Sequence, residues 1–183
     1  MLLARHTHSF PFDCVADGSV ATIGSFDGLH LGHRALLKHV FAESKRLGVP
    51  SIVMSFEPTP KEFFLAERPP ARLMRFREKY EALSAVGVDI FFCPRFDVAM
   101  KNIAADTFIR QILVHTFNVR YLVIGDDFRF GQDRGGHLAT LERAGKAIGF
   151  SVAQVSSVVE VDERVSSSVI RDALWTGDLD KAT

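Results

Sequence analysis

Two histidines follow a glycine-rich turn near the start of the chain, in the stretch GSFDGLHLGH that runs from Gly24 to His33. We expect a helix to begin near Leu29 to Leu31. His30 and His33 are then three residues apart and share one face of its first turn. That turn also offers free backbone N–H groups and the positive end of the helix dipole. Two imidazoles beside such donors can hold an anion and favour a more highly charged transition state.

Other types of site fit this stretch less well. It lacks the GxGxxG pattern of a dinucleotide-binding turn, and no GxxxxGK[ST] phosphate loop occurs in the chain. Paired histidines can be zinc ligands, but a zinc site needs further Cys, His or carboxylate ligands, and the sequence shows no companion cluster. They can also be ordinary surface or capping residues. The context of the turn favours an anion site over both alternatives.

The rest of the chain must position these histidines. Apolar runs at residues 20–26, 51–56, 88–93, 121–125 and 150–155 predict five strands. Helix-like patterns separate the runs, and several end at a glycine that suits a left-handed position after a helix. Strands that alternate with helices are typical of an α/β protein, in which helices cover both faces of a mostly parallel sheet.

Such sheets bind ligands beyond the carboxyl ends of their strands. Three unusual loops lie there: GSFDGLHLGH, FEPTPKEFF at residues 56–64, and GDDFRFGQDRGGH at residues 125–137. A fourth stretch, RVSSSVIRDAL at residues 164–174, offers Ser166 or Ser167 as a helix cap and places Arg171 in the first turns of the helix. The paired prolines of ERPPAR, residues 67–72, predict a flexible loop.

Composition sets broad limits. The chain has 183 residues, 22 basic against 22 acidic side chains, and 47% hydrophobic residues. One domain of this size buries about two thirds of its unfolded surface without disulfides. The charge balance argues against a broad nucleic-acid surface, and no apolar run reaches the roughly 20 residues of a membrane span. With no signal peptide recognisable, we expect a cytoplasmic protein. We also expect Cys14 and Cys93 to be reduced and packed, since neither lies in a CxxC pair.

The four loops together resemble the FAD synthetase module of bacterial bifunctional riboflavin kinase/FMN adenylyltransferases, in the nucleotidylyltransferase superfamily. GSFDGLHLGH resembles the GxFDGxHxGH signature, FEPTPKEFF the FDPHPxE loop, VIGDDFRFGQDRGG the VGxDFRFGxxRxG loop, and VSSSVIRDAL the ISSTRIR helix start. All four occur in the family's order. The resemblance implies a Rossmann-like nucleotidylyltransferase fold and transfer of AMP from ATP to the phosphate of FMN, which yields FAD and pyrophosphate with Mg²⁺.

The resemblance also implies a role for each matched position. The implied catalytic residues are His30, His33, Ser167 and Arg171, with the arginine at the leaving pyrophosphate. The implied ATP-binding residues are Gly24, Ser25, Phe26, Asp27, Gly28, His30, Gly32, His33, Ser166, Ser167, Ser168 and Arg171. The implied FMN-binding residues are Phe56, Pro58, Asp127, Phe128 and Arg129, and Asp127 is also a candidate Mg²⁺ ligand. For Phe56 or Phe128 taken alone, core packing is the alternative. For the acidic pair Asp126 and Asp127, simple solvation or capping is the alternative.

Some positions depart from the family pattern. Glu57 replaces Asp, Thr59 replaces His, and Ser168 and Val169 replace Thr-Arg. The lost imidazole and guanidinium bear on flavin affinity and on triphosphate contacts. Two alternative functions therefore stay open. One is a sister enzyme acting on phosphopantetheine, nicotinate mononucleotide or an alcohol phosphate, against which the long second and third loops argue. The other is a flavin- or nucleotide-binding regulatory domain without turnover.

The domain organisation follows from the same resemblance. In the family the chain continues into a riboflavin kinase module of β-barrel type, whereas this sequence stops at Thr183. We expect residues 1–183 to form one FMN adenylyltransferase domain without riboflavin kinase activity. Its expected partners are ATP, FMN and, in a longer chain, a riboflavin kinase domain, with no nucleic acid and no membrane.

Overall fold

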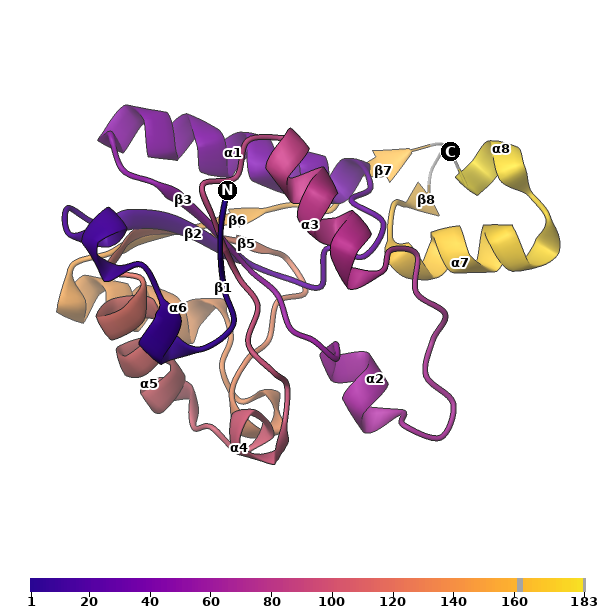
Figure 1. The fold of residues 1–183 in the computed structure, drawn as a ribbon. Coiled ribbons are helices and arrows are strands. Elements are labelled where there is room, and N and C mark those ends of the chain that lie inside the picture. The colour runs from indigo at the N-terminus through magenta and orange to yellow at the C-terminus, as the bar shows by residue number, and fades with distance from the viewer. Residues whose placement is uncertain (161–162, 183) are drawn as a thin grey trace.

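A six-stranded parallel sheet forms the centre of the computed structural model, which describes residues 1–160 and 163–182 (Figure 1). The strand order is β1-β4-β3-β2-β5-β6, and every neighbouring pair is parallel. The strands are β1 (Leu2–Ala4), β2 (Ser19–Ile23), β3 (Ser51–Met54), β4 (Ile90–Phe92), β5 (Val119–Gly125) and β6 (Ser151–Val155). A separate antiparallel pair, β7 (Val159–Glu160) and β8 (Glu163–Arg164), follows the sheet.

Helices cover both faces of this sheet (Figure 1). One face carries α1 (Leu31–Leu47) and α3 (Phe76–Ala85), and the other carries α5 (Ala105–Phe108), the π-helical segment η3 (Ile109–Thr116) and α6 (Leu138–Ile148). The remaining helices are α2 (Pro60–Phe64), α4 (Val98–Lys101), α7 (Ser167–Thr176) and α8 (Leu179–Ala182), and the 3₁₀ turns are η1 (Thr7–Ser9), η2 (Phe12–Val15) and η4 (Gln132–Arg134). Within the described ranges, none of the helices has the length and apolar character needed to cross a membrane.

The central strand β2 shows why the sheet is covered on both sides. All five of its residues are buried. Ala21 and Ile23 pack into the core formed with α5, η3 and α6, whereas Val20 packs into the core formed with α1 and α3. Successive side chains of a strand point to opposite faces, so a strand with helices on both sides must be apolar throughout.

The structure confirms the five predicted strands as β2 to β6, with somewhat different ends. The short edge strand β1 and the β7–β8 pair were not predicted. Helices α1 and α6 end at the left-handed glycines Gly48 and Gly149, as their patterns predicted, and α7 ends at the left-handed Gly177. One cysteine expectation was wrong: Cys93 is buried, but Cys14 is exposed in the turn η2. Within this turn the neighbouring Val15, and not Cys14, packs into the core. Thr183 lies outside the described residues.

Candidate active site

The signature loop connects the end of β2 to the start of α1. His30 is the N-cap residue of α1, and its ring stacks on that of His33 with the ring centroids 3.8 Å apart. The predicted shared face of the two histidines is therefore confirmed. Gly28 has φ +89°, and a Cβ at this position would lie 2.8 Å from the Leu73 side chain, so the turn requires glycine. A Cβ on Gly32 would lie 3.2 Å from the His30 ring, which therefore approaches the helix backbone closely.

The two histidines do not act as a simple pair of cations. Burial, together with the smaller effect of the nearby charges of His30 and Lys79, lowers the pKa of His33 to about 3. The His33 ring also packs against Phe26, with the centroids 4.9 Å apart, and the Phe26 side chain is completely buried. His33 is therefore neutral at physiological pH and can offer only a neutral hydrogen bond.

Asp27 joins the signature loop to two distant segments. Its carboxylate is buried and accepts hydrogen bonds from the backbone N–H groups of Leu73 and Met74, at 3.0 and 2.8 Å. It also forms an ion pair with the Arg171 guanidinium at 2.5 Å. The backbone carbonyl of Asp27 accepts a hydrogen bond from the Ser167 hydroxyl at 2.8 Å. The start of α7 is thereby fastened to the signature loop, although some 140 residues separate the two in sequence.

The serines at the start of α7 have different partners. Ser166 is the N-cap residue and accepts a hydrogen bond from the Val169 N–H at 3.3 Å, which confirms one of the two predicted caps. Ser168 lies on the exposed side, where its hydroxyl is 3.5 Å from the Lys61 ammonium. The sequence predicted that these serines and the signature loop belong to one site, and the structure brings them together.

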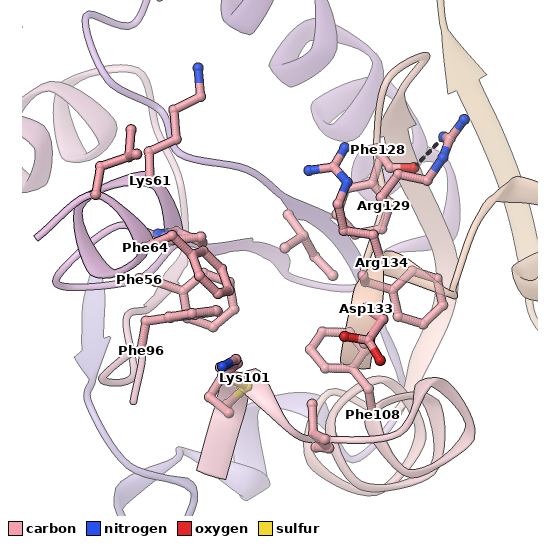
Figure 2. A pocket seen from close by; sticks show the side chains of 17 residues that line it. Phe56, Lys61, Phe64, Phe96, Lys101, Phe108, Phe128, Arg129, Asp133 and Arg134 are labelled. Carbon is pink, nitrogen blue, oxygen red and sulfur yellow. Dashed lines mark hydrogen bonds between the residues drawn. The ribbon is translucent and has the colours of Figure 1, made fainter. Parts of the chain in front are cut away.

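A cavity of about 610 Å³ opens at the carboxyl ends of the strands (Figure 2). Figure 2 shows Phe56, Phe64 and Phe96 gathered on one wall and Phe108, Arg129 and Arg134 on the opposite wall. The residues that line it are Ile23, Phe56, Pro60, Lys61, Phe64, Leu65, Phe96, Met100, Lys101, Ile103, Phe108, Phe128, Arg129, Phe130, Gly131, Asp133 and Arg134. The cavity is thus mostly aromatic and aliphatic, with basic groups among its lining.

Three of the five residues predicted to bind a flavin nucleotide line this cavity. Phe56 packs edge-to-face on Phe96 at 5.3 Å, and Phe128 stacks on Phe130 at 5.6 Å with an interplanar angle of 17°. Arg129 lies on the wall beside Phe128 and donates a hydrogen bond to its carbonyl. Pro58 and Asp127 are not among the described residues that line the cavity. Both remain predictions without a cavity contact.

Thr59, which departs from the family's histidine, begins α2. Its hydroxyl and backbone N–H form a capping box with Glu62, in which the Thr59 N–H lies 2.7 Å from the Glu62 carboxylate. Arg72, from the stretch predicted to be a loop, forms ion pairs with Glu62 and with Glu57, the latter at 2.6 Å. Residues 67–72 are indeed without helix or strand, and their ionic contacts tie them to the loop that follows β3.

Sequence reasoning missed several charged residues of the site, and Lys79 is the most deeply buried of them. Lys79 on α3 is only 3% exposed, and its ammonium donates a hydrogen bond to the Ser25 carbonyl at 2.7 Å. Burial lowers its pKa. The signal was present in the sequence, because Lys79 lies four residues before Leu83 and so shares the face of α3 that packs on the sheet. Phe64, Phe96 and Phe108 were also missed, and no local pattern marks them as neighbours.

Lys79 belongs to a cluster of charges at the junction of these segments. Three carboxylates and three cations line one narrow cleft: Asp27, Glu57, Glu62, Arg72, Lys79 and Arg171. Their charges balance. Among the residues that the structure describes, no three His, Cys, Asp or Glu side chains are grouped as a metal site would require.

A parallel sheet with binding loops at its carboxyl ends, and a histidine pair at the mouth of α1, defines a Rossmann-like α/β fold of the nucleotidylyltransferase type. The chain belongs to the FAD synthetase family, whose model matches residues 14–169. The resemblance inferred from the four loops and the predicted fold class are therefore confirmed.

Relatives of this family are similar along almost the whole chain. The bifunctional riboflavin kinase/FMN adenylyltransferase of Escherichia coli K12 is 42% identical over 98% of the chain, which covers 57% of that protein. The Haemophilus influenzae protein of the same name is 42% identical over 100% of the chain, which covers 58% of it. The chain therefore spans somewhat more than half the length of these relatives.

Two solved structures share the fold. A structure titled as a macrolide-efflux protein from Streptococcus pneumoniae aligns with 99% of this chain and 59% of its own, with a TM-score of 0.81 and 24% identity. The pantoate-β-alanine ligase of Francisella tularensis aligns with 98% of this chain and 76% of its own, with a TM-score of 0.61 and 15% identity. At these identities, both similarities support the fold alone.

Proposed function

We propose that this domain transfers AMP from ATP to the phosphate of FMN and so makes FAD and pyrophosphate. The observation that carries the proposal is an aromatic cavity placed directly beside an anion-binding loop. Ile23, which lines the cavity, immediately precedes the signature loop, and Lys61, also in its lining, reaches Ser168 at the start of α7. A ligand with a flat apolar end and an anionic end fits this arrangement.

The cavity suits the flavin part of such a ligand. Its volume of about 610 Å³ falls in the usual range for small-molecule sites. Phenylalanine rings on facing walls can pack against a flat ring system. The basic groups Lys61, Lys101, Arg129 and Arg134 lie in the same lining and can attract the phosphate of FMN. The aromatic walls would not help an enzyme that acts on a small aliphatic alcohol phosphate.

The adenylyl transfer needs alignment more than acid–base chemistry. An oxygen of the FMN phosphate attacks the α-phosphorus of ATP, and pyrophosphate leaves with the bridging oxygen and its electron pair. Since that phosphate oxygen is already deprotonated, no general base is required. His30 and His33, stacked at the start of α1, can donate hydrogen bonds to the phosphates. Because His33 is neutral, Arg171 and the first turn of α1 supply positive charge near the leaving group.

Magnesium is proposed as part of the bound nucleotide. The described residues contain no cluster of three metal-ligating side chains, which fits an ion held mainly by phosphates and water with one or two carboxylates. Asp127, which follows β5, is the residue proposed to contribute such a carboxylate. The ion would neutralise part of the triphosphate charge.

The proposal also assigns a place to the riboflavin kinase named in the relatives. Its product is FMN, so a kinase module in the same chain or on a separate protein would supply the substrate. We assign no riboflavin kinase activity to residues 1–183, which we propose to act as a single adenylyltransferase domain. Substrates such as ATP and FMN fit a cytoplasmic location.

The test is a pair of incubations with ATP and Mg²⁺, one with FMN and one with riboflavin. Chromatography measures FAD and FMN, and a coupled assay measures pyrophosphate. The proposal expects equal amounts of FAD and pyrophosphate from FMN and no product from riboflavin. A His30→Asn variant should lose this activity, whereas a variant of the exposed His8, His8→Asn, should keep it. Binding of FMN and ATP without pyrophosphate release would contradict the proposal and favour a regulatory domain.

A further inference from the structure

Lys79 is a buried cation that the proposed chemistry does not use. It lies on α3 and is 3% exposed, and within the described ranges it and Asp27 are the charged residues classed as buried. Removing an ammonium from water costs several kcal/mol unless hydrogen bonds and nearby charges compensate. A lysine in such a place therefore needs a physical reason.

The contacts of Lys79 join two neighbouring strands at their carboxyl ends. Its ammonium donates to the Ser25 carbonyl at 2.7 Å and to the Ser55 hydroxyl at 3.4 Å. The Ser55 hydroxyl donates to the same Ser25 carbonyl at 3.0 Å. Ser25 belongs to the signature loop after β2, and Ser55 directly follows β3. One carbonyl oxygen of the loop is thus held by two donors, one of which is charged.

Holding this carbonyl determines how the next peptide group is oriented. The Ser25–Phe26 peptide is trans, and in a trans peptide the C=O and N–H bonds point in opposite directions. The Phe26 N–H therefore points away from Lys79. Phe26 also has φ +47°, a left-handed conformation that costs of the order of 1–3 kcal/mol in a non-glycine residue and persists only where the surroundings enforce it.

The same contacts reach the histidine pair. The buried Phe26 ring packs against the ring of His33 at 4.9 Å, and His33 stacks on His30. A change in the Ser25–Phe26 peptide would therefore be transmitted to both imidazoles through rings in contact. Lys79 is also one of the three cations that balance three carboxylates in the adjoining cleft. Without it, this cleft beside the loop would carry a net negative charge.

We propose that Lys79 is a positioning residue for adenylyl transfer: its buried ammonium holds the Ser25 carbonyl and so keeps the signature loop and its two histidines in the reactive arrangement. The inference rests on the proposed function for its catalytic consequence. Its structural consequence, an ordered loop at residues 24–33, does not depend on that function. Lys79 lies outside the aromatic cavity. Replacing Lys79 should therefore change kcat and the binding of the nucleotide rather than the binding of the flavin.

The central variant is Lys79→Met, which keeps the length of the side chain and removes the charge. The Ser25 carbonyl retains the Ser55 hydroxyl as a donor, and the Asp27 carboxylate retains Arg171 as its ion-pair partner, so the substitution leaves neither group without a partner. We expect kcat to fall about 10- to 100-fold, the size of effect typical of a misplaced reacting group. The KM for FMN and the melting temperature should stay close to those of the wild type. Lys38→Met, at an exposed position on α1, is the matched control.

Hydrogen exchange of the loop is measured in parallel, without any turnover. Lys79→Met should exchange faster than the wild type at residues 24–33, with the strands of the sheet unchanged, and Lys79→Arg should restore part of both kcat and protection. Unchanged loop exchange, or loss of kcat only in step with global unfolding, would overturn the inference. If the wild type makes no FAD, the proposed function fails, and the exchange comparison alone then decides whether Lys79 orders the loop.

Discussion

Replacing His33 by asparagine should reduce the sensitivity of the protein to acid. Burial lowers the pKa of His33 to about 3 in the folded protein, whereas a histidine in an unfolded chain has a pKa of about 6.5. Between these two values the unfolded state binds a proton that the folded state does not. The free energy of unfolding must therefore fall as the pH falls through this window, and the contribution is complete above pH 6.5.

The size of the effect follows from the two pKa values. Between pH 7.5 and pH 5, protonation of His33 in the unfolded state should remove about 2 kcal/mol of stability from the wild type. The variant His33→Asn lacks this contribution. The stability of the variant should thus depend less on pH than that of the wild type.

Urea unfolding at several pH values between 7.5 and 5 measures this difference. The free energy of unfolding is determined at each pH for the wild type, for His33→Asn and for the control His8→Asn. Groups that titrate equally in all three proteins cancel when the pH-dependent losses are compared. If the losses of the wild type and His33→Asn were equal within 0.5 kcal/mol, roughly the scatter of additive effects, the assignment of His33 as a buried neutral residue would be refuted.

Three further variants test the proposed roles in the site. His30→Ala should lower kcat by about two to three orders of magnitude, as for the loss of one preorganised donor; normal turnover in steady-state assays would remove His30 from the catalytic account. Arg171→Ala should lower kcat more than FMN affinity, and an FMN fluorescence titration that showed the reverse would contradict its place near the leaving group. Phe128→Ala should mainly raise the KM for FMN, whereas a lower melting temperature with an unchanged KM would assign Phe128 to the core alone.

Local sequence patterns predicted the parts of this protein that depend on neighbouring residues. The apolar runs predicted β2 to β6 because a parallel strand covered on both faces must be apolar throughout. The turn and the spacing of His30 and His33 predicted one shared helix face, and the stacked rings confirm it. Ser166 or Ser167 was predicted as a cap because a serine before a helical pattern satisfies a free N–H group of the first turn, and the structure selects Ser166.

The tertiary structure decided what depends on distant residues. No pattern in the signature loop shows that Asp27 binds Arg171, which follows it by 144 residues. The cavity joins phenylalanines from α2, α5 and the loops after β3, β4 and β5, and only the parallel order of the strands brings these segments to one edge. Burial also depends on tertiary packing, and it makes His33 neutral. The packing of α3 on the sheet likewise places the Lys79 ammonium within hydrogen-bond distance of the Ser25 carbonyl. The sequence thus determined the elements and the identity of the reactive groups, whereas their charge states and partners followed from packing because desolvation and contact act through space and not along the chain.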